Sequence, residues 1–243
     1  HDAAQAYAAV ANARKHGFNN ISIDLIYALP GQDMKDWEQQ LDAAFQLQVE
    51  HISAYGLTYE KGTALWKRRQ KGQIREVDDE TTIAMFNRLR ASMKENGFEA
   101  YEISNYAKPG FKSQHNSAYW KFIPYLGLGP SAHSFDGTSR QWNVSSIRQY
   151  SKHIQEENSF FEKEILSEQD FYNDYVMIAL RTTQGIDLNY LHQRFGQEAL
   201  DDCLQNAKLH LANKELTLLD NHLSLSDTGI HIANIVMVNL MKV

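Results

Sequence analysis

The side chains best suited to chemistry lie within the six residues 115–120. They are His115, Asn116, Tyr119 and Trp120. An imidazole can bind a metal ion or transfer a proton, and a neighbouring amide can orient it. The two aromatic rings offer flat apolar faces to a planar ligand. The segment lacks helical periodicity, so we expect an irregular, ordered segment here. A tightly packed loop without a ligand explains the same composition, and both interpretations stay open.

A carboxylate lies on a predicted strand. Ile21–Tyr27 is typical of a buried strand, in which Ser22, Asp24 and Ile26 share one face. The other, apolar face should pack on helices, so Asp24 should point to the interior near the carboxyl end of the strand. Parallel α/β folds place their ligands at that end. Because a buried carboxylate needs a partner, Asp24 is either a ligand contact or a structural residue bonded to backbone or to an arginine.

A glycine-containing segment has the spacing Gly127-x-Gly129-x-x-Ala132. This spacing matches the loose dinucleotide-binding fingerprint, but no helix clearly follows it and Pro130 lies inside it, so we reject nicotinamide dinucleotide binding. We expect these glycines to let the backbone approach a ligand edge-on. His133, which follows at once, is either a ligand-facing residue or a core histidine.

The elements that must position these residues alternate between strand and helix. Ile21–Tyr27 and His51–Thr58 are predicted strands, and the helix between them begins after Asp33, a typical N-cap residue. A strand, a helix and a second strand form a βαβ unit, which predicts a parallel sheet, either a closed or partial barrel or a doubly wound sheet. The residues from Glu99 to Asn143 are short of helical periodicity, and we expect strands and ordered loops there.

A composition change near residues 158–167 predicts a domain boundary. Three helices are predicted beyond it before two short apolar runs, and Asp220-Asn221 between these runs is a hairpin signal. Three helices and a β-wing describe a winged-helix-like domain. We therefore expect an α/β domain over residues 1–160 and a mainly α, winged-helix-like domain over residues 161–243.

Composition excludes several classes of protein. The 243 residues carry a net charge of −6, and residues 168–243 carry five basic and ten acidic side chains, which argues against nucleic-acid binding. No apolar run approaches the ~18 residues of a membrane span. The single cysteine, Cys203, rules out a disulfide framework and fits a reducing compartment such as the cytoplasm. We expect Cys203 to be a buried structural thiol.

Six basic residues and no acidic ones lie between Lys61 and Arg75. Such a stretch can attract carboxylates or an anionic membrane surface, which would place the protein at the membrane periphery. A solvated helix face is the simpler explanation.

Several motifs resemble one protein family. The run Asn20–Gln32, read NISIDLIYALPGQ, resembles the DLIYGLPGQ signature of the oxygen-independent coproporphyrinogen III oxidase family, with Ala28 where the family usually has glycine. That family includes HemN and HemW and belongs to the radical S-adenosylmethionine (SAM) enzymes. Further matching motifs follow in order: His51–Tyr55, Tyr101–Ala107 and Tyr125–Ser134. The resemblance implies the C-terminal part of a radical-SAM partial (β/α) barrel, followed by the winged-helix-like domain.

Within the family, His115–Trp120 matches the HNxxYW motif of HemW, and HemN looks different there. The resemblance to HemW implies a haem chaperone, which binds haem and delivers it to an acceptor protein. The alternative is an oxygen-independent coproporphyrinogen III dehydrogenase, which converts propionates to vinyl groups by radical oxidative decarboxylation. A winged-helix module that binds nucleic acid is the remote alternative.

The resemblance also implies cofactors and site residues. Family members hold a [4Fe–4S] cluster on three N-terminal cysteines and bind SAM on its fourth iron. Those cysteines are absent from this chain, so we expect no resident metal and an inactive fragment that lacks the N-terminal part. By position, the SAM side would include Asp24, Thr58, Ala132 and His133. The haem side would include His115 as axial ligand, with Asn116, Tyr119 and Trp120 around it. A dimer formed through the opened barrel is a further expectation.

Overall fold

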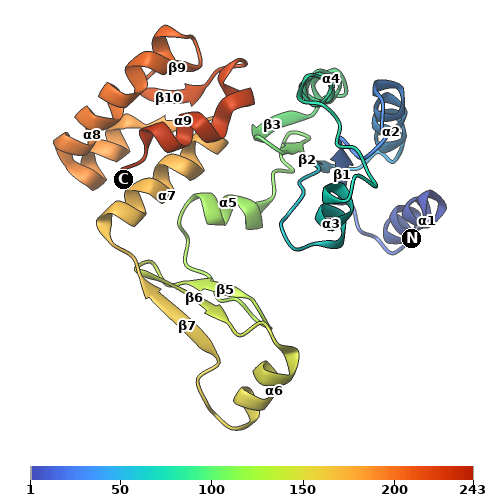
Figure 1. Ribbon diagram of the computed structural model, residues 1–243, viewed down its shortest axis with the longest axis horizontal. Helices are drawn as coiled ribbons and strands as arrows, with labels where there is room; N and C mark the ends of the chain where they lie inside the picture. Colours follow the sequence, from blue (N-terminus) through green and yellow to red (C-terminus); the bar gives the residue numbers. More distant parts are fainter. Residues whose placement is uncertain (1, 243) are drawn as a thin grey trace. The chain divides into compact units, whose positions relative to one another are not determined.

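The computed structural model describes residues 2–242. The chain divides into two compact units, residues 1–113 and residues 114–243. The first unit contains one sheet and the second contains two (Figure 1). Each unit also has its own buried side chains. The predicted boundary at residue 160 falls within the second unit and stays a prediction.

The first unit is built on a four-stranded sheet with the order β1-β2-β4-β3. Its strands are β1 (Ser22–Tyr27), β2 (His51–Gly56), β3 (Glu99–Glu102) and β4 (Asn105–Ala107). The first two strands run parallel, in a register that pairs Asp24 with Ser53, and β4 runs antiparallel to both of its neighbours. The predicted βαβ unit is confirmed, because α2 (Met34–Gln46) connects β1 to β2.

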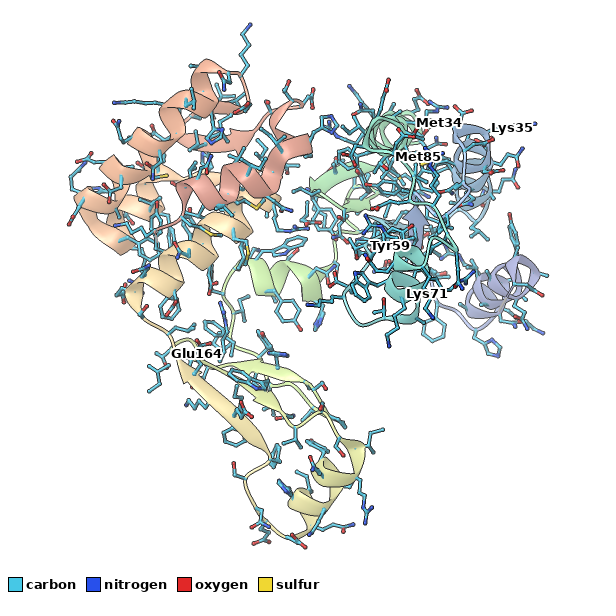
Figure 2. All side chains as sticks on the ribbon, viewed as in Figure 1. Met34, Lys35, Tyr59, Lys71, Met85 and Glu164 are labelled. Carbon is cyan, nitrogen blue, oxygen red and sulfur yellow. The ribbon has the colours of Figure 1, made fainter. Side chains whose placement is uncertain are left out.

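Helices α2 and α4 (Asp79–Glu95) pack together over the apolar side of this sheet (Figure 1). Asp33 caps α2 through a bond from the Asp36 amide to its carboxylate, as the sequence predicts. Trp37 is fully buried, its ring lies 5.5 Å from that of Tyr27, and its indole N–H donates to the carbonyl of Met85 on α4. Figure 2 labels Met85. A helix-to-helix hydrogen bond inside an apolar core thus fixes α2 against α4.

Two further helices of this unit bury none of their residues: α1 (Ala3–Lys15) and α3 (Ala64–Gln70). The basic residues of α3 are exposed, and Arg69 pairs with Glu76. The basic residues of α3 therefore form a solvated helix face.

The second unit contains a three-stranded antiparallel sheet with the order β5-β6-β7. Its elements are α5 (Gln114–Trp120), β5 (His133–Phe135), β6 (Ser139–Asn143), α6 (Ile147–Gln155) and β7 (Phe161–Ile165). This sheet contacts helix α7 through an ion pair between Arg140 and Asp174 and through the rings of Phe135 and Phe171.

The rest of the second unit is a helical bundle with a small sheet of order β8-β10-β9. Its elements are α7 (Glu168–Arg181), β8 (Ile186–Asp187), α8 (Leu188–Ala212), β9 (Leu216–Leu219), β10 (His222–Leu225), the 3₁₀ turn η1 (Gly229–Ile232) and α9 (Ala233–Leu240). Gly196, at φ 87°, divides α8 into the two helices that the sequence predicts. The predicted hairpin is confirmed, since Asp220 and Asn221 both have positive φ, as a type I′ turn requires.

The expectation for residues 113–120 is wrong in one respect. His115 to Trp120 lie on helix α5, whereas the sequence predicts an irregular segment. The helix has seven residues and buries none of them, so no apolar periodicity marks it. Helix α5 ends at Trp120, and two residues later Phe122, rather than a glycine, adopts the left-handed φ of 52°, while the Ile123 amide bonds to the Ala118 carbonyl.

Candidate functional site

Helix α5 brings two reactive side chains together. His115 and Tyr119 lie one turn apart and are both exposed. The Tyr119 hydroxyl is 3.1 Å from His115 Nε2, and the two rings are perpendicular with centroids 4.9 Å apart. Asn116 and Trp120 are half-buried on the same helix. The helix therefore presents an imidazole and a phenol to solvent as a hydrogen-bonded pair.

The chain after α5 supports this pair. The ring of Tyr125 meets the ring of Tyr119 edge to face, with centroids 4.6 Å apart. Tyr125 is itself fixed, because it exchanges two backbone hydrogen bonds with Phe135 of strand β5. The sheet thus holds one aromatic ring against the exposed phenol.

Three polar side chains clamp the glycine-containing segment that follows. Ser134 accepts from the Gly127 amide, and the Tyr150 hydroxyl accepts from the Gly129 amide. Asn143, which is buried, donates to the carbonyls of both glycines. Sequence reasoning missed these three residues because they lie 7 to 21 positions along the chain from the glycines that they contact.

The structure corrects the expected role of Gly127. A Cβ atom at this position would overlap the backbone carbonyl of His133, so the close approach is made to the chain itself. Gly129 is needed for another reason, its φ of 103°, which L-residues rarely adopt. Both glycines therefore shape the turn that carries Tyr125.

Large apolar side chains are exposed beside this turn. Leu126 and Leu128 are 74% and 81% exposed, and Ile123 is also exposed. A cavity of about 410 Å³ lies along Tyr125, Leu126 and Phe135. Its volume is in the range of small-molecule sites, roughly 300–1,000 Å³. Leu126 is the exposed apolar residue that lines this cavity, and Asp136 and Gln141 make part of its wall polar. Exposed apolar side chains grouped on one turn are typical of a surface that meets a ligand or a partner.

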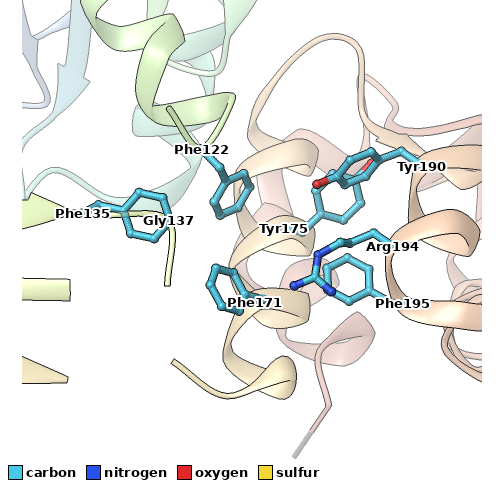
Figure 3. A pocket seen from close by; sticks show the side chains of 8 residues that line it. All are labelled: Phe122, Phe135, Gly137, Phe171, Tyr175, Tyr190, Arg194 and Phe195. Carbon is cyan, nitrogen blue, oxygen red and sulfur yellow. The ribbon is translucent and has the colours of Figure 1, made fainter. Parts of the chain in front are cut away.

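A smaller cavity lies between the turn after α5 and the C-terminal helices of the same unit (Figure 3). It has a volume of about 150 Å³ and is walled mostly by aromatic rings: Phe122, Phe135, Gly137, Phe171, Tyr175, Tyr190, Arg194 and Phe195. The Arg194 guanidinium lies over the Phe171 and Phe195 rings and is paired with Glu168. This cavity is too small for a tetrapyrrole and is best described as a gap in an aromatic core.

The first unit carries a second polar cluster that sequence reasoning missed. His51, which is buried, lies 2.7 Å from the Ser22 hydroxyl through Nδ1 and 2.6 Å from the Tyr101 hydroxyl through Nε2. The Tyr101 hydroxyl also accepts from the Ser113 amide, so it joins the His51 ring to the chain just before α5. The partners lie about 30 and 50 positions apart, which hides the cluster from sequence patterns.

The first unit also buries a carboxylate, that of Glu102 at the end of β3. It accepts from the Ser104 amide and from the Asn105 side chain, and Asn105 in turn accepts from the Ser53 hydroxyl. Asp24 differs from the expectation of a buried, partnered carboxylate. It is exposed, because β1 is the edge strand of the sheet and Asp24 lies on its open side.

Stability of the first unit should depend on the protonation of His51. Burial lowers the pKa of His51, while the Asp24 carboxylate opposes this shift. Because the folded pKa lies below the unfolded value of about 6.5, the stabilisation is complete above pH 6.5 and is lost as the pH falls through the folded pKa. The protection factors of the β1 and β2 amides, which are their exchange rates corrected for the intrinsic rate at each pH, should therefore fall as the pH is lowered from 7.5 to 5. His51→Asn should remove this acid dependence, and an unchanged profile in that variant would contradict the assignment.

Comparison with known proteins finds relatives of this chain. Residues 166–232 match the model of the HemN C-terminal domain. The chain is 34% identical over 206 residues to the heme chaperone HemW of Bacillus subtilis (strain 168), covering 84% of this chain and 54% of that protein. It is 30% identical to the mitochondrial radical S-adenosyl methionine domain-containing protein 1 of Bos taurus, covering 100% of this chain and 58% of the relative. The solved structure of HemN from Escherichia coli, described as a radical SAM enzyme, matches with a TM-score of 0.79 at 17% identity over 100% of this chain and 59% of that one. Over most of its length this chain is similar in sequence to HemW proteins, and residues 166–232 match the HemN C-terminal domain.

The chain spans just over half the length of these HemN/HemW relatives. The α/β fold expected from the resemblance is confirmed by the match to HemN. Among residues 2–242, no helix combines the length and the apolar character that crossing a membrane requires.

The residues expected on the SAM side of a HemN/HemW protein lie in both units. Asp24 on β1 and Thr58, just after β2, are exposed in the first unit. In the second unit, Ala132 precedes β5 and His133 is its first residue, with the His133 ring tilted against that of Trp142 at a centroid distance of 6.2 Å. Contact of these four residues with SAM stays a prediction.

Cys203 does not fit the role of a cluster ligand. It is buried in α8, and burial raises the pKa of its thiol to about 11, while a hydrogen bond with Tyr172 acts in the opposite direction. Iron–sulfur clusters are held by thiolates, which this environment disfavours. The predicted structural role of Cys203 is consistent with its place in the core.

Proposed function

We propose that this chain carries the haem-binding surface of a HemW-like haem chaperone. The observation that carries the proposal is the exposed His115–Tyr119 pair on α5, within the HNxxYW motif. Relatives that are 29–34% identical bear the name heme chaperone HemW. Haem is the cargo in this proposal, and an acceptor protein is the partner.

The surroundings of α5 support a large, flat, apolar ligand. Tyr119 and Tyr125 provide aromatic surface, and Leu126 and Leu128 expose aliphatic surface on the following turn. Both His115 and Tyr119 end in an atom that can bind haem iron, since histidine and tyrosine are both found as axial ligands. In the full-length relatives, SAM and a [4Fe–4S] cluster would act elsewhere in the protein.

Haem titration of this chain tests the proposal. We expect saturable binding with 1:1 stoichiometry, followed by absorbance, and we expect His115→Ala to weaken it by about tenfold or more, because loss of a charge-assisted contact costs roughly 1.5–3 kcal/mol. His153→Ala is a matched control, because His153 is a half-buried helical histidine of the same unit whose Nδ1 bonds to the Ser159 carbonyl. Equal affinity of the two alanine variants, or no saturable binding by the unchanged chain, would contradict the proposal.

The enzymatic alternative, a coproporphyrinogen III dehydrogenase, draws support from the structural match to HemN. That match is at 17% identity and shows the fold alone. Conversion of coproporphyrinogen III by the full-length, cluster-loaded protein is the result that would favour it. The nucleic-acid alternative is disfavoured by three exposed acidic residues on α8: Glu198, Asp201 and Asp202.

A further inference from the structure

The hydrogen bond between His115 and Tyr119 decides which of the two can serve as an iron ligand. His115 Nε2 is the ring nitrogen that lies farthest from the backbone, and it is the nitrogen that faces the Tyr119 hydroxyl at 3.1 Å. Ligation through Nε2 would therefore require this contact to break. The Tyr119 oxygen has no such restriction, because a phenolate oxygen can bind a metal and accept a hydrogen bond at the same time.

We propose that Tyr119 is the axial ligand of ferric haem and that His115 is its positioning residue and proton acceptor. This inference rests on the proposed haem-binding function. When haem binds, the Tyr119 O–H bond breaks and its proton passes to His115 Nε2. The Tyr119 oxygen forms the bond to Fe(III), and the water on that face of the iron leaves. No electron is transferred, and the imidazolium N–H then donates to the phenolate oxygen.

Two physical arguments favour tyrosine over histidine here. Fe(III) is a hard cation, and a phenolate is a hard, anionic ligand, as in catalase. A free tyrosine has a pKa near 10 and is a poor ligand near pH 7 unless a base takes its proton. His115 supplies that base at hydrogen-bond distance, one helical turn away.

The aromatic neighbour of Tyr119 completes the arrangement. Tyr125 contacts the Tyr119 ring edge to face at 83° and leaves Tyr119 38% exposed. The backbone bonds between Tyr125 and Phe135 fix this contact to the sheet. The phenol is therefore held from one side and open on the other, which leaves room for a planar ligand.

Spectroscopy of the haem complex tests this assignment. The unchanged chain should bind Fe(III) protoporphyrin with the phenolate-to-iron charge-transfer band and the tyrosinate resonance Raman modes of a tyrosine ligand. Tyr119→Phe should lose both signatures and bind about tenfold or more weakly. His115→Ala should weaken binding but keep the tyrosinate modes, and His115→Gln, which retains a hydrogen-bonding group, should restore part of the affinity.

Tyr7→Phe is the matched control, because Tyr7 is a helical tyrosine of similar exposure, 42%, on α1 of the first unit and outside the proposed site. It should retain both signatures. An unchanged spectrum and affinity in Tyr119→Phe, with loss of ligation in His115→Ala, would assign the iron to His115 and overturn this inference while leaving the proposed function intact. Absence of saturable binding by the unchanged chain would instead overturn both. Circular dichroism of each variant separates loss of a ligand from loss of the fold.

Discussion

Replacing Gly127 with alanine should destabilise the second unit around β5 and β6 and abolish haem binding with it. The added Cβ atom would overlap the His133 carbonyl, and this atom cannot move without breaking the β5–β6 register. Relief therefore requires a backbone shift, for which we expect a cost of about 3 kcal/mol or more. The same shift would pull the Gly127 amide from Ser134 and displace Tyr125 from Tyr119.

Amide exchange followed by mass spectrometry measures this effect where it arises. A loss of 3 kcal/mol corresponds to roughly a hundredfold faster exchange of the β5 and β6 amides. Leu126→Ala and Leu128→Ala are controls for stability, since each truncates a largely exposed side chain next to Gly127 and should stay within about 0.5 kcal/mol of the unchanged chain. If the β5 and β6 amides of Gly127→Ala exchanged as slowly as those of the unchanged chain, the turn would be able to accept the Cβ atom without loss of stability.

Replacing Trp37 with alanine should destabilise the first unit by about 3–5 kcal/mol. The indole is fully buried between α2, α4 and Tyr27, and it contributes both a large apolar surface and the hydrogen bond to the Met85 carbonyl. A cavity of this size cannot close, because the sheet and two helices surround it. The amides of β1 and β2 should exchange faster by two orders of magnitude or more, and those of α8 should be unaffected.

Two further variants separate the contributions of Trp37. Trp37→Phe keeps an aromatic ring but removes the indole N–H, so we expect a smaller loss, of about 1–2 kcal/mol. Phe18→Ala removes an aromatic ring of similar size that is 62% exposed, and it should change stability by less than about 0.5 kcal/mol. A similar loss in Phe18→Ala and Trp37→Ala would show that the α2–α4 core does not carry the stability of this unit.

Local patterns determined the elements whose signals lie within a few residues. The Asp33 cap, the Asp220-Asn221 hairpin and the division of α8 at Gly196 were all predicted, because capping and turn geometry depend on neighbouring residues. The end of α1 depends on neighbouring residues in the same way, since Gly17 has φ 87° and the Phe18 amide bonds to the Ala13 carbonyl. The run of motifs indicated the family in the same way.

The sequence by itself therefore determined the βαβ unit, the winged-helix-like end and the position of the HNxxYW motif. Only the tertiary structure decided what surrounds the candidate residues. His51 meets Tyr101 across 50 positions, and Asn143 reaches back to Gly129 across 14. Helix α5 escaped prediction because it buries no residue and because Phe122, rather than a glycine, adopts positive φ just after its end. The His115–Tyr119 contact depends on that helix, since a helical turn brings side chains four positions apart within hydrogen-bond distance.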